Sequence, residues 1–144
     1  MAHADKGKYA QKHSQEIKVE DSLKKEVQQA AKENNVACAA AEEIAGRKAL
    51  AIGEVGIALD LLNINIIECQ LGLFGYSPQK KIVQPAKEVA PGLKQAINDA
   101  LSDGRLPCAA AWAIAKQINL PRMKVSAACE ALKIKIKPCQ LGAF

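Results

Sequence analysis

The chain has 144 residues, which suits one ordinary domain or two small domains that pack together. Hydrophobic residues make up 49% of it and aromatic residues 3%, so Ala, Ile and Leu carry the apolar content, and a helical protein is favoured over a β-sandwich. No apolar run approaches the ~18 to 20 residues that span a bilayer, and the first twenty residues lack the apolar core of a signal peptide. We therefore expect a cytoplasmic protein with no membrane partner.

The net charge of +5 is unevenly distributed along the chain. Residues 1–75 hold 9 Lys or Arg against 11 Asp or Glu, which gives −2. Residues 76–144 hold 11 against 4, which gives +7. Only the second half is therefore suited to a polyanionic partner.

Residues 36–74 align with residues 106–144 without a gap, at an offset of 70 positions. The alignment contains 17 identities in 39 positions, which indicates an internal duplication. The longest identical runs are Cys-Ala-Ala-Ala at 38–41 and 108–111, and Cys-Gln-Leu-Gly at 69–72 and 139–142.

The first part of the chain is predicted to be a polar leader followed by one helical module. Residues 1–19, which include His3 and His13, are polar and expected to be flexible and solvated. Residues 20–74 form the first module. Its three predicted helices carry apolar faces at Leu23, Val27, Ala30 and Ala31, then at Ala41, Ile44 and Ala45, then at Val55, Ala58 and Leu62, with a short strand at 63–66.

Residues 75–90 contain Pro78 and Pro85 and are predicted to be an extended linker. The second module, residues 91–144, begins a helix at Pro91 and has a turn at 119–121. Its apolar faces comprise Leu93, Ala96, Ile97, Ala100 and Leu101, then Ala111, Ile114, Ala115 and Ile118, then Val125, Ala128 and Leu132. A period-two strand follows at 133–137. Because an isolated strand is marginal, we expect the two strands to pair with each other across the copies.

The pattern A-x-x-I-A, a turn, then V-x-x-A-x-x-x-L-x-I-x-I resembles the helix-turn-helix units of bacterial and archaeal DNA-binding regulators. It is matched at Ala111, Ile114, Ala115, Leu120, Val125, Ala128, Leu132, Ile134 and Ile136, and at the equivalent positions 70 residues earlier. We expect a mainly α fold with short β-strands, arranged as two duplicated three-helix modules.

The resemblance implies that the second helix of each turn is the recognition helix. In the second copy, the implied DNA-binding residues are Arg122, Met123, Lys124, Ser126 and Ala127, followed by Lys133, Lys135 and Lys137 on the strand. Lys and Arg neutralise phosphates, and Arg also reads guanine edges, although a solvated basic face is the alternative. The same positions of the first copy are acidic and apolar, which favours packing or a protein partner through Ile52 and Ile57.

The five cysteines are an odd number and contain no C-x-x-C pair. Cys38, Cys69, Cys108 and Cys139 form two equivalent pairs, which invites a thiol-based metal or redox sensor. Cys38 and Cys108 fall on apolar helix faces, however, so we favour buried structural thiols and expect no cofactor. Trp112 is interpreted as an inter-module packing residue, and Gln70 and Gln140 as bonding backbone in a turn.

No phosphate-binding glycine loop, paired carboxylates or activated nucleophile is evident, so an enzyme is disfavoured. We interpret the chain as a DNA-binding, transcription-regulator-like protein whose basic second module contacts duplex DNA. The alternatives are a non-enzymatic protein-interaction or assembly module, and the thiol sensor.

Overall fold

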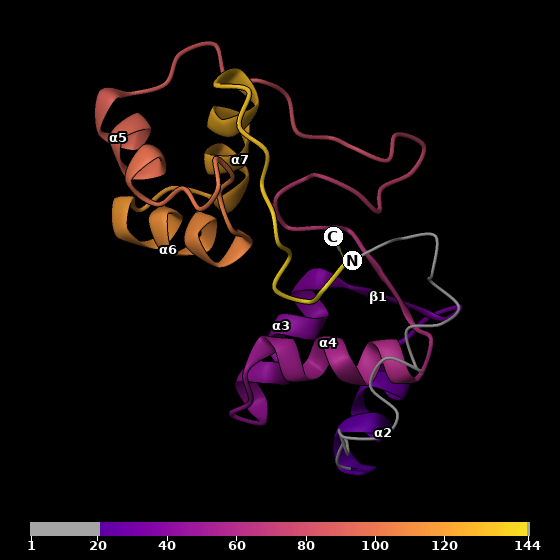
Figure 1. Cartoon of the computed structure of the whole chain (residues 1–144). Coiled ribbons are helices and arrows are strands. Elements are labelled where there is room, and N and C mark those ends of the chain that lie inside the picture. Colours follow the sequence, from indigo (N-terminus) through magenta and orange to yellow (C-terminus); the bar gives the residue numbers. More distant parts are fainter. Residues whose placement is uncertain (1–20, 144) are drawn as a thin grey trace. The chain divides into compact units, whose positions relative to one another are not determined.

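A computed structural model describes residues 21–143, which form a mainly helical protein with short strands (Figure 1). The predicted fold class, mainly α with short β-strands, is confirmed. The predicted leader, with His3 and His13, lies outside the described residues. No helix in the described part of the chain is long and apolar enough to cross a bilayer.

The helices and strands follow one another in the order α2 (Asp21–Ala30), β1 (Asn35–Ala37), α3 (Cys38–Arg47), α4 (Ile52–Leu61), β2 (Asn65–Ile67), α5 (Pro91–Asp99), α6 (Cys108–Ile118) and α7 (Arg122–Ala131). Helices α5, α6 and α7 begin 70 residues after α2, α3 and α4, respectively. This spacing equals the offset between the two sequence copies.

The chain divides into two compact units. Among the described residues, unit 1 comprises 21–69 together with 140–143, and unit 2 comprises 70–139. The sequence had suggested modules at 20–74 and 91–144, so the structure assigns the end of each sequence copy to the other unit. These end segments are anchored by buried leucines, because Leu71 is fully buried and Leu141 nearly so.

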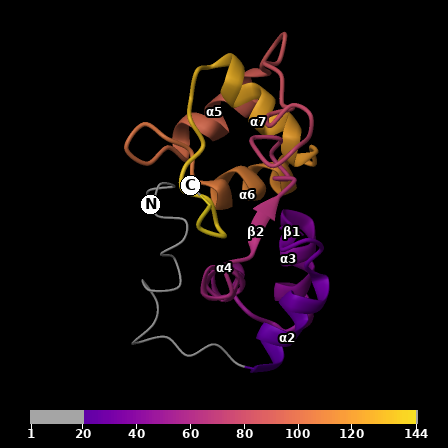
Figure 2. The same ribbon diagram turned by 90° about the vertical axis from the view of Figure 1, so that its right-hand side faces the viewer.

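In unit 1, α2, α3 and α4 pack around an apolar core, and β1 lies beside β2 (Figure 2). The two strands are parallel, and Asn35, Val36 and Ala37 pair with Asn65, Ile66 and Ile67. The largest core side chains are Leu23, Val27, Val36, Ile44, Val55 and Leu59.

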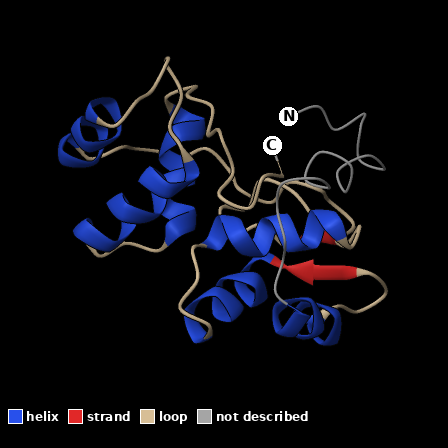
Figure 3. Cartoon of the chain, turned by 60° about the horizontal axis from the view of Figure 1, so that its bottom comes forward, coloured by secondary structure: helices blue, strands red, loops and turns tan. Residues whose placement is uncertain are grey.

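In unit 2, α5, α6 and α7 pack in the same way, with helices again the dominant elements (Figure 3). A parallel bridge joins Leu106 to Ile136, 70 residues beyond the pair formed by Val36 and Ile66. The core includes Leu93, Ile97, Leu106, Ala111, Ile114 and Val125.

The predicted pairing of strands between the two copies is wrong. The strand at 65–67 pairs with β1, and Ile136 pairs with Leu106 of its own copy. The partner strands escaped prediction because each is too short to show alternation and runs directly into a helix.

The prediction that Ile118 is a core residue is also wrong, because this side chain is 40% exposed. Helix α6 ends at Ile118, and the next residue turns the chain away in the left-handed conformation. The equivalent residue of the first copy is Lys48, which donates a hydrogen bond to Ser22. Neither copy therefore uses this position for its core.

The first helix of each turn ends in the same hydrogen-bonded motif. Leu50 N donates to Ala45 O and Ala49 N to Gly46 O, at 2.9 and 3.2 Å. Leu120 N and Asn119 N donate in the same way to Ala115 O and Lys116 O. The motif places Ala49 at φ 54° and Asn119 at φ 61°. Alanine is poorly suited to this left-handed conformation, which costs it about 1 to 2 kcal/mol.

Exchanging the glycine and alanine at this helix end should stabilise the protein. Gly46 is helical and exposed, with open space where a Cβ would lie, so Gly46→Ala should favour the helix. Ala49→Gly should relieve the left-handed strain. The double variant is expected to raise the free energy of unfolding by about 1 to 2 kcal/mol in chemical denaturation followed by circular dichroism.

The matched control is Ala113→Gly at an exposed position inside α6, which should lower the free energy of unfolding by about 0.5 to 1 kcal/mol. A destabilising Ala49→Gly substitution would show that the turn does not adopt this conformation.

Candidate nucleic-acid interface

Helix α7 is the helix that the resemblance assigns to DNA recognition. It follows the turn Asn119-Leu120-Pro121, and Pro121 is its N-cap residue. Val125, Ala128 and Cys129 are buried in the core of unit 2. Arg122, Met123, Ala127 and Glu130 are half-buried on the same helix.

Residues 70–86, the covering segment, contact these half-buried residues of α7. Arg122 Nη1 donates a 2.9 Å hydrogen bond to Gln70 Oε1. The Ala86 backbone N–H donates to the Ala127 carbonyl at 3.0 Å, and Lys81 forms an ion pair with Glu130. The segment therefore contacts α7 along its length, from its first residue to its last turn.

The middle of the covering segment folds back on itself above Met123. The Gly72 carbonyl accepts hydrogen bonds from Ile82 N and Val83 N, at 2.9 and 3.1 Å. Gly72 has φ +74°, and a Cβ there would lie 3.2 Å from Met123 Cε. Val83 is buried, so the part of the predicted linker that contains it packs within unit 2.

Arg122 also contacts the aromatic ring of Trp112. Its guanidinium carbon lies 3.7 Å from the centroid of the Trp112 ring, a cation–π contact. Trp112, interpreted from sequence as an inter-module packing residue, makes this contact inside unit 2. Gln70, expected to bond backbone in a turn, accepts a hydrogen bond from the Arg122 side chain. Arg122 is therefore half-buried and engaged by two partners.

The structure divides the predicted DNA-binding residues into two groups. Arg122, Met123 and Ala127 lie against the covering segment, and Ser126 is fully buried. Four lysines remain exposed, namely Lys124, Lys133, Lys135 and Lys137.

Two of these lysines, Lys135 and Lys137, flank Ile136 in the segment that pairs with residue 106, and Lys133 lies in the turn that ends α7, at φ 58°. Because Leu106 pairs in parallel with Ile136, the preceding residue Arg105 lies in register with Lys135. Leu106 N donates to Lys135 O and Lys137 N to Leu106 O, at 2.9 and 2.8 Å. Arg105 is exposed and was missed in the sequence analysis, which recognised no strand before α6.

We call Arg105, Lys133, Lys135 and Lys137 the basic edge of unit 2. None of the four forms an ion pair with another residue in the range 21–143. The equivalent residues of unit 1 are Asn35, Asn63, Asn65 and Ile67, which carry no charge. The positive charge at these positions is thus specific to the second copy.

In unit 1, residues 140 and 141 pack against α4. An added Cβ at Gly56 would lie 2.4 Å from the Leu141 carbonyl oxygen, and one at Gly53 would lie 3.8 Å from that of Gln140. Ile52 and Ile57, predicted to contact a protein partner, are half-buried. The contact found beside them is with the chain's own C-terminal residues.

The cysteines are all free thiols, and Cys139 is the least buried of the five. In the part of the chain that the structure describes, no three His, Cys, Asp or Glu side chains come together to hold a metal ion. Burial and the neighbouring Glu130 carboxylate raise the pKa of Cys129 from 9.0 to about 11, so this thiol is protonated and unreactive at neutral pH.

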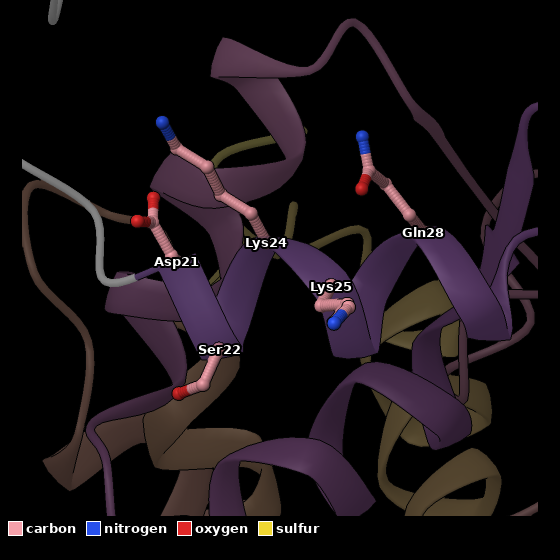
Figure 4. A pocket seen from close by; sticks show the side chains of 5 residues that line it. All are labelled: Asp21, Ser22, Lys24, Lys25 and Gln28. Carbon is pink, nitrogen blue, oxygen red and sulfur yellow. The ribbon is translucent and has the colours of Figure 1, made fainter.

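A surface pocket lies on α2, away from these residues in the sequence (Figure 4). It is lined by Asp21, Ser22, Lys24, Lys25 and Gln28, all from one helix. Several of these side chains extend away from the helix, so they do not converge on one point (Figure 4).

Comparisons with known proteins add no relative. No family model, curated protein or solved structure matches the chain.

Ser126 offers a test of the packing beneath the covering segment. Its side chain is fully buried, and its hydroxyl has no hydrogen-bond partner among the described residues. An unpaired buried hydroxyl costs about 1 to 3 kcal/mol. Ser126→Ala should therefore raise the free energy of unfolding by about 1 kcal/mol in chemical denaturation.

The control for this substitution is Ser22→Ala, which removes an exposed hydrogen bond from Lys48 and should change stability by less than about 0.5 kcal/mol. A loss of stability in Ser126→Ala would mean that the hydroxyl has a partner.

Cys129 should make the protein less stable at high pH. Above pH 9 the thiol ionises in the unfolded chain but stays protonated in the folded one, so the unfolded state binds fewer protons. The free energy of unfolding should therefore fall as pH rises from 9 to about 11. The free energy of unfolding of the Cys129→Ala variant should fall less steeply over the same pH range. Equal slopes for the variant and the wild type would contradict the raised pKa of Cys129.

Proposed function

We propose that the chain is a non-enzymatic DNA-binding protein that contacts the phosphate backbone through the basic edge of unit 2. The observation that carries this proposal is the set of four exposed cations at Arg105, Lys133, Lys135 and Lys137, which have no ion-pair partner among the described residues. Neutral residues occupy the same four positions of unit 1.

The strand-like backbone supports this role. Lys135 and Lys137 lie on either side of Ile136 in the bridged segment, so an extended chain directs both of them away from Ile136. Lys133 lies in the turn that ends α7, at φ 58°. Ile136 is buried in unit 2 and anchors the segment. Cations held on a packed backbone can each neutralise a phosphate and release its counterions.

The contacts of α7 argue against the sequence-reading mode that the resemblance implies. Arg122 would have to leave Gln70 and the Trp112 ring before it could form two hydrogen bonds to a guanine. Met123 and Ala127 lie under the covering segment. We therefore propose binding with little sequence preference, because phosphate contacts position a protein without specifying bases.

A second candidate function is a protein-interaction or assembly module. It is favoured by a different observation, namely that α4 packs against residues 140 and 141 and that α7 packs against the covering segment.

The DNA proposal predicts a salt-dependent affinity that depends on the basic edge. Reversing Lys133 and Lys135 to Glu should lower the slope of log affinity against log salt by about 2, because each lost phosphate contact removes about 0.9. Arg122→Gln should leave the slope unchanged. Fluorescence anisotropy of a labelled duplex, titrated at several salt concentrations, measures both effects.

The matched control is reversal of Lys25 and Lys32, two exposed lysines of unit 1, to Glu. This pair changes the net charge by the same amount and should have a much smaller effect. The proposal fails if the intact protein has no affinity for any duplex at ~50 mM salt, or if both pairs weaken binding equally.

A further inference from the structure

The boundaries between the two units fall at equivalent places in the two sequence copies. The chain passes from unit 1 to unit 2 between residues 69 and 70, and returns between residues 139 and 140. Each crossing lies between the Cys and the Gln of a Cys-Gln-Leu-Gly run. Each copy therefore places its Gln-Leu-Gly segment in the unit that contains the other copy's helices.

The segment that enters unit 1 lies against α4. Figure 1 shows the yellow C-terminal end of the chain reaching this helix. Leu141 is 3% exposed, and its carbonyl oxygen approaches Gly56 so closely that a Cβ would lie at 2.4 Å. Contact of this kind requires glycine at position 56, whereas Gly53, one turn earlier, has ordinary space for a methyl group.

The segment that enters unit 2 lies against α7, as described above, with Gln70 accepting from Arg122. The residue equivalent to Gly56 is Ser126, so the two helices hold their segments with different side chains. The Gly56 contact is thus a particular property of α4.

We propose that the α4 docking site (Gly53 and Gly56) and the C-terminal tail (residues 140–143) are a complementary pair through which the chain binds a second copy of itself. Each chain of such a dimer places its tail on the α4 of the other. This inference is independent of the proposed DNA binding.

The reason is the connectivity of the tail. It is covalently attached to unit 2, whereas its docking site belongs to unit 1, so the same contacts form within one chain or between two. A reciprocal exchange closes with two-fold symmetry and loses no contact. Within one chain, the attachment supplies an effective concentration on the order of millimolar, which favours the monomer at lower protein concentrations.

We expect the partner to be a second copy of the chain, because the segment that packs on α4 is the chain's own C-terminal tail. The tail contributes a buried leucine between Gln140 and Gly142, and Gly142 has φ +83°. A ligand for α4 must reproduce this backbone as well as the leucine, and every copy of the chain carries it.

Two variants that disable opposite halves of the contact test the proposal. Gly56→Ser blocks the docking site and leaves the tail intact, while Leu141→Asp spoils the tail and leaves the docking site intact. Serine is the residue that α7 carries at the equivalent position, so α4 should tolerate it as a helix. Neither variant can form the contact between its own tail and its own α4. The intact tail of Gly56→Ser and the intact docking site of Leu141→Asp are therefore both available to a partner.

We expect each variant alone to be monomeric and their 1:1 mixture to form a heterodimer, measured by sedimentation equilibrium at ~0.5 mM of each chain. The wild type should dimerise increasingly as its concentration approaches the millimolar range. Gly46→Ala, which adds a methyl group to an exposed helical glycine of unit 1 with open space around it, is the control and should behave as the wild type.

The proposal is overturned if the mixture contains no more dimer than the separate variants, or if either variant dimerises as well as the wild type. Circular dichroism checks that both variants keep their helices. Gly56→Ala provides a second block of the docking site if the serine variant fails to fold.

Discussion

The close packing of a Gln-Leu-Gly segment on the second helix of each turn is the contact on which the organisation of this protein depends. It buries Leu71 and Leu141 and assigns each segment to the unit that holds the other copy's helices. Because the segments lie against α4 and α7, the helices that resemble recognition elements are partly covered by the chain itself. Among the described residues, the exposed cations at Arg105, Lys133, Lys135 and Lys137 lie outside α7 itself.

Charge has changed between the copies without a change of backbone register. Asn35 pairs with Asn65 in unit 1, while Arg105 lies in register with Lys135 in unit 2. Exposed strand positions accept such substitutions because they do not contribute to the core. A positively charged edge can arise in this way on one copy, while the other retains an uncharged edge at the same place.

The duplicated cysteines are explained by packing. Cys38 and Cys108 are the buried first residues of α3 and α6, and the surrounding core is rich in alanine. A free thiol behaves there as a small hydrophobic side chain. The raised pKa of Cys129, which the burial of its thiol causes, belongs to the same apolar environment.

The sequence by itself determined the mainly helical fold class, because the apolar positions recur with helical spacing around Ile44 and Ile114. It also located the turn at Asn119-Leu120-Pro121. Of the strand predicted at 133–137, however, only Ile136 forms a bridge, to Leu106. The tertiary structure alone decided the strand partners, since Val36 and Leu106 carry no periodic signal in such short segments. It alone decided that Arg122 is engaged by Gln70 and Trp112, and that residues 140–143 pack on α4. Periodicity reports which side of a helix is apolar, whereas the segment that comes to cover the remaining sides depends on contacts between residues far apart in the chain.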